Sequence, residues 1–373
     1  MNRPQLAKTA VDECRTGSSV IRIREAREGD NDALIELQKQ CPQGTNLVLG
    51  IDSSPDYFAR CKPFKDWHVF VACEDDSIIG SAAYAINETL VGGVQLKTAY
   101  EYGFMVDPHH RRRGIAVKLQ KHIEQIAADN KIDLLHLDIT EENLPSIGFF
   151  SKMGFRKVKD CAVFSLMVYR RQSIERETNI RCMKKKDINK VTDLINKTYR
   201  DYNFFTPFQT NELMQYVGRM PYFDLNSIVV YEDAEDIRAC LGFWDYNKVR
   251  RYIVQRFSWR LKAQAVLMKL ARAFTKVPDI PKPGESLLSY NLATLGCRDV
   301  GSVTELIKYV VNVALEKRVN FLHMPVDPES PIAAALSQFR HTRMKLHFFI
   351  KPLVQEALPD LKGRNVYIDV SEM

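Results

Sequence analysis

The sequence lacks long apolar runs and paired cysteines. No stretch of its 373 residues approaches the ~20 consecutive apolar residues that a membrane-spanning helix needs. Its eight cysteines are scattered and none forms a C-x-x-C pair, so we expect no zinc or other metal. Residues 1–19 are polar and mixed in charge, unlike a secretory signal, and we expect a flexible tail there. Together these absences predict an intracellular, cytoplasmic protein, with the nucleus left open.

The excess of positive over negative charge lies in one part of the chain. The formal net charge is +7. Residues 248–276 carry nine lysines and arginines and no acidic residue, and removing those nine leaves a net charge of −2. Apolar residues recur among the basic ones at roughly helical spacing, so we expect a basic helix. It is either a packed helix with a solvated face or a surface for an acidic partner, nucleic acid or an anionic membrane.

The most informative stretch begins with an apolar strand that ends at Val106 and Asp107-Pro108. It continues as Arg111-x-x-Gly114-x-Ala116 and runs into an amphipathic pattern. Apolar residues at spacings of four, four and three place one face of a helix toward the core, namely Ile115, Leu119, Ile123 and Ile126. A helix start offers unpaired N–H groups and a positive dipole, which suit a phosphate. The alternative is a basic turn between a strand and a helix.

A second motif follows at residues 143–155. A strand at 134–139 precedes a short helix that begins at Asn143 and is closed by Gly154. The combination resembles the GNAT family of acyl-CoA-dependent N-acyltransferases. The Q/R-x-x-G-x-G/A pyrophosphate loop of that family matches Arg111, Gly114 and Ala116, and its Asn-led helix ending in Gly-Phe matches Asn143 to Phe155. The resemblance covers roughly residues 20–170.

The resemblance implies an α+β fold with a mixed, mostly antiparallel sheet whose central strands splay apart to admit acetyl-CoA. The acceptor is then an amine, on a small molecule or a protein. The strand end would pair with the pantetheine arm and supply an N–H to the oxyanion, and the loop amides would hold the pyrophosphate. The cofactor-binding residues implied are Phe104, Met105, Val106, Arg111, Arg112, Arg113, Gly114, Ile115, Ala116, Asn143, Ser146, Phe149 and Phe150.

Two carboxylates are candidate general bases. Glu101 lies on the strand before the loop, where it is either a base or a solvent-facing charge. Asp138 lies on the next strand among apolar residues, where it is either a base with a raised pKa or a hydrogen-bonded structural residue. Phe150 departs from the family, because many members carry a tyrosine there that protonates the leaving thiolate. Water, Ser146 or Ser151 would have to replace that proton donor.

The pattern restarts after a polar linker at 171–178. Residues 20–170 form the predicted catalytic, acetyl-CoA-binding domain, and residues 179–373 a second GNAT-like domain with a basic helical insertion at 246–285. In the second copy Arg298 and Gly301 keep the loop spacing, but Asp299 would repel a pyrophosphate and Val303 is bulkier than alanine. This layout is similar to plant HOOKLESS-type acetyltransferase-like proteins.

Two functions follow from these motifs. The first is an N-acetyltransferase in which the second domain shapes the acceptor site. The second is an acetyl-CoA-binding scaffold with little catalysis, which docks an acidic partner or nucleic acid through residues 248–276. The intact loop at Arg111 to Ala116 is consistent with both, whereas Phe150 and the altered second copy favour the scaffold. The sequence leaves the acceptor and the oligomeric state open.

Overall fold

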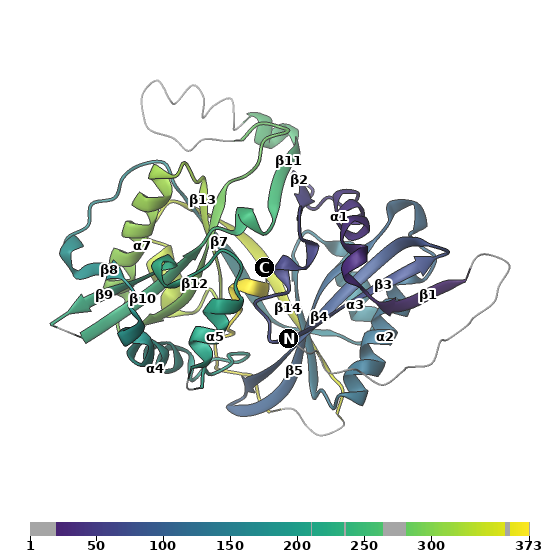
Figure 1. Cartoon of the computed structure of the whole chain (residues 1–373), viewed down its shortest axis with the longest axis horizontal. Helices are drawn as coiled ribbons and strands as arrows, with labels where there is room; N and C mark the ends of the chain where they lie inside the picture. Colours follow the sequence, from purple (N-terminus) through teal and green to yellow (C-terminus); the bar gives the residue numbers. More distant parts are fainter. Residues whose placement is uncertain (1–19, 210, 235, 264–280, 355–358, 373) are drawn as a thin grey trace.

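A computed structural model describes residues 20–209, 211–234, 236–263, 281–354 and 359–372 (Figure 1). The predicted tail at 1–19 lies outside this part of the chain. Among the described residues no helix is both long and apolar enough to cross a membrane. We call residues 20–170 the first half and residues 179–373 the second half, following the predicted boundaries.

The first half opens with a strand and a helix and continues with a three-stranded meander, as predicted. Its long strand ends at Val106, and the helix after the loop packs with Leu119 and Ile123 fully buried against the sheet. The elements are β1 (Ile21–Glu25), α1 (Asn31–Lys39), β2 (Leu47–Asp52), β3 (Asp66–Glu74), β4 (Ser77–Val91), β5 (Val94–Val106), α2 (Ile115–Asp129), β6 (Leu134–Thr140), α3 (Leu144–Lys152) and β7 (Arg156–Met167).

The second half repeats this order. Its elements are β8 (Ile180–Cys182), α4 (Ile188–Tyr199), α5 (Glu212–Arg219), β9 (Ile228–Asp233), β10 (Asp236–Trp244), β11 (Arg251–Phe257), β12 (Ser289–Cys297), α7 (Val300–Glu316), β13 (Phe321–Val326), α8 (Pro331–Leu336) and β14 (His341–Pro352). The predicted α+β fold with a mostly antiparallel sheet is therefore confirmed. Strands β2 and β14 and helix α5 were not predicted from the sequence.

The two halves share one twelve-stranded sheet and exchange their last strands. The strand order is β1-β3-β4-β5-β6-β14-β7-β13-β12-β10-β9-β8. Strand β14 of the second half pairs with β6, and β7 of the first half pairs with β13. The exchanged strands also pair with each other, so they form the centre of the sheet between the two lobes in Figure 1. Each half therefore depends on the other for its final strand.

Both halves open at the same place in the sheet. Strands β5 and β6 are parallel and pair only over residues 98–100 and 134–136, and β12 and β13 pair only over 289–291 and 321–323. Beyond these pairs each couple of strands separates. A bulge follows at Gly103 (φ +67°) in β5 and at Thr294 (φ +43°) in β12. The predicted splay is thus present in the first half and repeated in the second.

The predicted helical insertion at 246–285 is wrong for its first part. Residues 251–257 form β11, which pairs with β2 in a separate two-stranded sheet that joins the two halves. Arg251 lies within 2.5 Å of Asp52 across this pair. The consecutive residues Tyr252, Ile253 and Val254 are aromatic or β-branched, which suits a strand here. Residues 264–280, and with them the second part of the predicted basic helix, lie outside the described residues.

The strand exchange predicts that the first half will not fold alone. In residues 20–170, β6 would lose β14, whose Phe348, Phe349 and Ile350 are almost fully buried. Each such side chain contributes about 2 kcal/mol to stability, which together approaches the whole ~5–15 kcal/mol of a typical domain. We expect the fragment to be insoluble or to show no cooperative thermal unfolding by circular dichroism.

Co-expression with residues 171–373 provides the control, because that fragment supplies β14. We expect the two fragments to purify together as a soluble complex. A soluble 20–170 fragment with a cooperative unfolding transition would contradict the prediction.

Candidate functional site

The site is the opening between β5 and β6. After Tyr100 the backbone of β5 has no pairing with β6, so the strand end at Phe104 to Val106 pairs with β4 on one side and borders the gap on the other. The Val106 carbonyl accepts hydrogen bonds from Arg111 Nε at 3.2 Å and from Cys41 Sγ at 3.5 Å. An unpaired strand edge can bind an extended ligand through its backbone.

The loop after β5 presents a helix start whose amides are not capped. Gly114 is the N-cap of α2 and adopts φ +77°, and Arg112 adopts φ +65°. Gly114 supplies no side-chain cap, and the first turn of α2 contains no acidic residue. A Cβ added at Gly114 would meet no atom within 4 Å, so the space in front of the amides is open. This arrangement suits a phosphate group.

The three loop arginines are not equivalent. Arg113 forms a two-pronged ion pair with Glu74 at 2.8 and 2.5 Å, which raises the pKa of the arginine. Arg111 donates to the Val106 carbonyl, as described above. Both side chains therefore help to hold the loop against the strands, and all three arginines remain exposed. Arg113 would have to leave Glu74 to contact a phosphate. Arg112 forms no ion pair with the described residues, so it could contact a phosphate directly.

Helix α3 brings an aromatic cluster to the end of β5. The ring of Phe104 lies 5.1 Å from that of Phe150 and 6.4 Å from that of Phe149, and Phe155 completes the cluster. Phe150 is 5 % exposed. Asn143 is the N-cap of α3 and accepts a hydrogen bond from the Ser146 amide at 3.3 Å. The side-chain oxygen of Asn143 is thus already engaged in holding the helix.

Glu101 is buried on the α2 side of the sheet. It is 3 % exposed, and its Oε1 accepts a hydrogen bond from Gln120 of α2 at 3.0 Å, while Oε2 has no partner. Burial raises the pKa of Glu101 to about 8, against the opposing effect of the Gln120 hydrogen bond. The solvent-facing alternative for Glu101 is therefore wrong. The carboxyl is largely protonated at neutral pH and is not a ready base.

Asp138 lies on the other side of the sheet, so the structure does not bring the two candidate bases together. It follows the last β5–β6 pair by two residues and interacts with the hydroxyl of Tyr100. Its Oδ1 is buried and has no partner. Burial raises the pKa of Asp138 to about 6, although the positive charge of Arg60 and the Tyr100 hydrogen bond act in the opposite direction. Asp138 is thus partly ionised near neutrality.

Sequence reasoning missed the polar cluster around Asp138. The Tyr100 hydroxyl and Arg60 Nη2 both donate to the carbonyl oxygen of Glu372, the latter at 3.2 Å. Arg60 is 8 % exposed and lies over the ring of Tyr102. These groups come from the residues before β3, from β5 and from the C-terminal segment. No local motif connects them, and the only sequence signal was the apolar setting of Asp138.

The equivalent site in the second half is closed to an anion. Asp299 is the N-cap of α7, where its Oδ1 accepts from the Ser302 amide at 2.8 Å and its Oδ2 from the Ser302 hydroxyl at 3.0 Å. The carboxylate therefore occupies the place in which α2 leaves its amides open. Ion pairs also join Asp299 to Arg238 of β10 and the loop residue Arg298 to Asp236.

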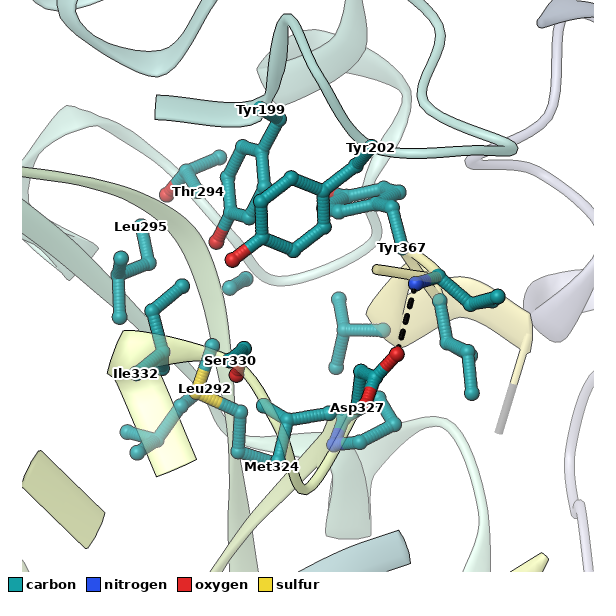
Figure 2. Close-up of a pocket in the computed structure, with 16 residues that line it drawn as sticks. Tyr199, Tyr202, Leu292, Thr294, Leu295, Met324, Asp327, Ser330, Ile332 and Tyr367 are labelled. Carbon is teal, nitrogen blue, oxygen red and sulfur yellow. Dashed lines mark hydrogen bonds between the residues drawn. The ribbon is translucent and has the colours of Figure 1, made fainter. Parts of the chain in front are cut away.

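The gap between β12 and β13 forms a small pocket (Figure 2). Tyr199 and Tyr202 of the α4 end face Asp327 and Ser330 across it. The C-terminal segment closes one side, because the amide of Val366 donates to Asp327 Oδ2 at 3.0 Å. This pocket is the counterpart of the β5–β6 opening. Here, however, side chains of the protein itself line the space between the two separated strands.

Comparison with known proteins agrees with this geometry. Residues 31–155 match the model of the acetyltransferase (GNAT) family. An N-alpha-acetyltransferase of Saccharolobus solfataricus is 25% identical over 144 residues, which are 37% of this chain and 81% of that protein.

Similar solved structures show the fold of the whole chain. N-myristoyltransferase of Saccharomyces cerevisiae with bound myristoyl-CoA has a TM-score of 0.64 at 12% identity and covers 96% of this chain and 91% of its own. A GCN5-related N-acetyltransferase of Anabaena variabilis has a TM-score of 0.53 at 11% identity, over 90% and 73% of the two chains. The uncapped loop and the splayed strands β5 and β6 lie within residues 31–155, so the part of the chain that matches the acetyltransferase (GNAT) family is the part that holds the candidate site.

Proposed function

We propose that the protein is an N-acetyltransferase that transfers acetyl from acetyl-CoA to an amine, with a single donor site in the first half. The carrying observation is the contrast between the two helix starts. The amides of α2 stand open behind Gly114, whereas those of α7 are occupied by Asp299. The pyrophosphate would bind at residues 111–116 and the pantetheine arm along Phe104 to Val106.

A short acyl group fits the surroundings of the strand end. The rings of Phe149 and Phe150 lie 4.9 Å apart, and Phe104 and Phe155 pack against Phe150 at 5.1 and 5.3 Å. This close packing fills the space on the α3 side of the opening, where a long chain would have to displace aromatic side chains. The similar yeast structure is that of a myristoyltransferase. Comparing acyl-CoA donors with short and long acyl chains therefore tests the proposal directly.

The reaction is a direct attack in a ternary complex. The lone pair of the neutral amine forms a bond to the thioester carbonyl carbon, and the carbonyl oxygen takes up negative charge, which a backbone N–H at the end of β5 stabilises. The C–S bond then breaks and CoA leaves as a thiolate. One proton is lost from the amine nitrogen and one is taken up by the sulfur.

Asp138 is our choice for the base that receives the amine proton. Its free oxygen, its position just beyond the last β5–β6 pair and its pKa of about 6 suit that role. Phe150 has no proton for the thiolate and lies in an aromatic cluster. Water therefore protonates the sulfur, which a thiol pKa near ~8.5 permits.

Calorimetric titration of the full chain with acetyl-CoA tests the proposal. We expect one site per chain, and a clearly weaker affinity for myristoyl-CoA than for acetyl-CoA. Two sites would contradict the closed second half, and the opposite order of affinities would make the protein a long-chain acyltransferase. Binding without CoA release for any amine acceptor would favour the scaffold function instead.

A further inference from the structure

Arg250 is a largely buried arginine that forms no ion pair with any residue the structure describes. It lies between the turn at Tyr246–Lys248 and β11, and its side chain is 8 % exposed. Its Nε is buried and has no hydrogen-bond partner within the described parts of the chain. Burying a charge without a partner is costly, and buried arginines are normally paired with carboxylate or phosphate.

Arg250 shares its surroundings with Arg60 of the candidate site. Burial raises the pKa values of the Tyr57 and Tyr246 hydroxyls, and the positive charges of both arginines oppose this rise at each tyrosine. Both arginines therefore lie close to the same two hydroxyls. Arg60 also has a buried Nε without a partner, although its Nη2 donates to the Glu372 carbonyl. The free donors of two guanidiniums are thus gathered at the junction of the two halves.

Two carboxyl groups, those of Asp138 and Glu372, lie near Arg60. Asp138 Oδ1 and Glu372 Oε2 are buried oxygens without partners. Arg60 acts on both carboxyls, which places them around its guanidinium, and neither carboxyl is paired with Arg250. Burial raises the pKa of Asp138 to about 6 and that of Glu372 well above its ordinary value. At neutral pH the cluster therefore has an excess of positive charge at its Arg250 end.

We propose that the acceptor is a small amine that also bears a carboxylate, as in an α-amino acid, and that Arg250 binds the carboxylate. The amine end would then face the Arg60 side of the cluster. A planar guanidinium can hold a carboxylate by two parallel hydrogen bonds, which makes the contact specific as well as strong. This assignment rests on the proposed acetyltransferase function and names the substrate class of the same site.

The test compares amino acids with their own carboxamides. The full chain is mixed with acetyl-CoA and either one of the twenty L-amino acids or the matching amino-acid amide, and CoA release is followed with a thiol reagent. We expect at least one amino acid to be acetylated with a higher kcat/KM than its amide. In Arg250→Gln this preference should fall by about tenfold or more, since the charged contact is lost.

Arg256→Gln is the matched control, because Arg256 is an exposed arginine on the adjacent strand β11. This variant should leave the ratio of kcat/KM for the amino acid to kcat/KM for its amide unchanged. Wild-type protein that acetylates amides as well as acids, or an Arg250→Gln variant with an unchanged ratio, would overturn the assignment. Failure of the proposed function looks different, because then no amine would release CoA at all.

Product inhibition of the wild type gives a second measurement that does not depend on the folding of a variant. N-acetyl-amino acids should inhibit CoA release at lower concentrations than N-acetyl-amino-acid amides. Equal inhibition by the two product series would count against a carboxylate contact in the same way.

Discussion

Gly114→Glu will abolish acetyl-CoA binding, with an affinity loss of at least about a hundredfold in calorimetric titration. Gly114 caps α2 at φ +77°, where a residue with a side chain is strained by about 1–2 kcal/mol. The larger effect is electrostatic. The new carboxylate would extend into the open space before the α2 amides and compete for them with the pyrophosphate, as Asp299 does at α7.

Gly301→Glu is the matched control in the second half. Gly301 keeps the same spacing from Arg298 as Gly114 does from Arg111, but the adjacent helix start already carries Asp299. Acetyl-CoA should bind Gly301→Glu with wild-type affinity and one site per chain. Loss of binding in this variant, together with retention in Gly114→Glu, would move the donor site to the second half.

Asp138→Asn will lower kcat by about 10²–10⁴-fold, the usual contribution of a positioned base. A base must be deprotonated to act, so wild-type kcat should rise with pH through about 6, the pKa of Asp138, and level off above it. The asparagine variant should lose this rise. A stopped assay of product formation from pH 5 to 8 at saturating substrate concentrations measures both effects.

Glu101→Gln tests whether the buried carboxyl of Glu101, rather than that of Asp138, acts as the base. Burial raises the pKa of Glu101 to about 8, so the residue is already mostly neutral at pH 7 and the amide mimics that state. We expect kcat at pH 7 to change by less than about tenfold, with the rise near pH 6 retained. If Glu101→Gln instead removed the pH dependence and Asp138→Asn kept it, the roles of the two carboxyls would be reversed.

The parts of this molecule that sequence could predict are those set by neighbours along the chain. The spacing of Ile115, Leu119 and Ile123 predicted α2, and the apolar stretch that ends at Val106 predicted β5. Cap chemistry marked the start of α3 at Asn143. Asp299 caps α7, which was not predicted, and its predicted repulsion of a pyrophosphate stays a prediction. Each of these features depends on a few consecutive residues and on backbone groups that they alone satisfy.

The rest depends on residues that are distant in sequence. Nothing near Leu134–Thr140 indicates that β14 will lie beside it, because any apolar strand could fill that edge. Likewise Arg60 and Glu372 belong to unrelated segments, and only the packing of the two halves gathers them around Asp138. Periodicity also misassigned residues 251–257, where pairing with β2 outweighed helical spacing. The domain boundaries at 170 and 179 stay a prediction.

The exchanged strands also determine when the protein can become complete during its synthesis. The sheet of the first half closes only when Pro352 meets Leu134, so β6 emerges from the ribosome long before its neighbour exists. Contacts between such distant residues form late, and an unpaired strand edge is open to wrong partners in the meantime. A chain stopped before His341 by a nonsense mutation would therefore lose both lobes, although every residue of the donor loop had been made.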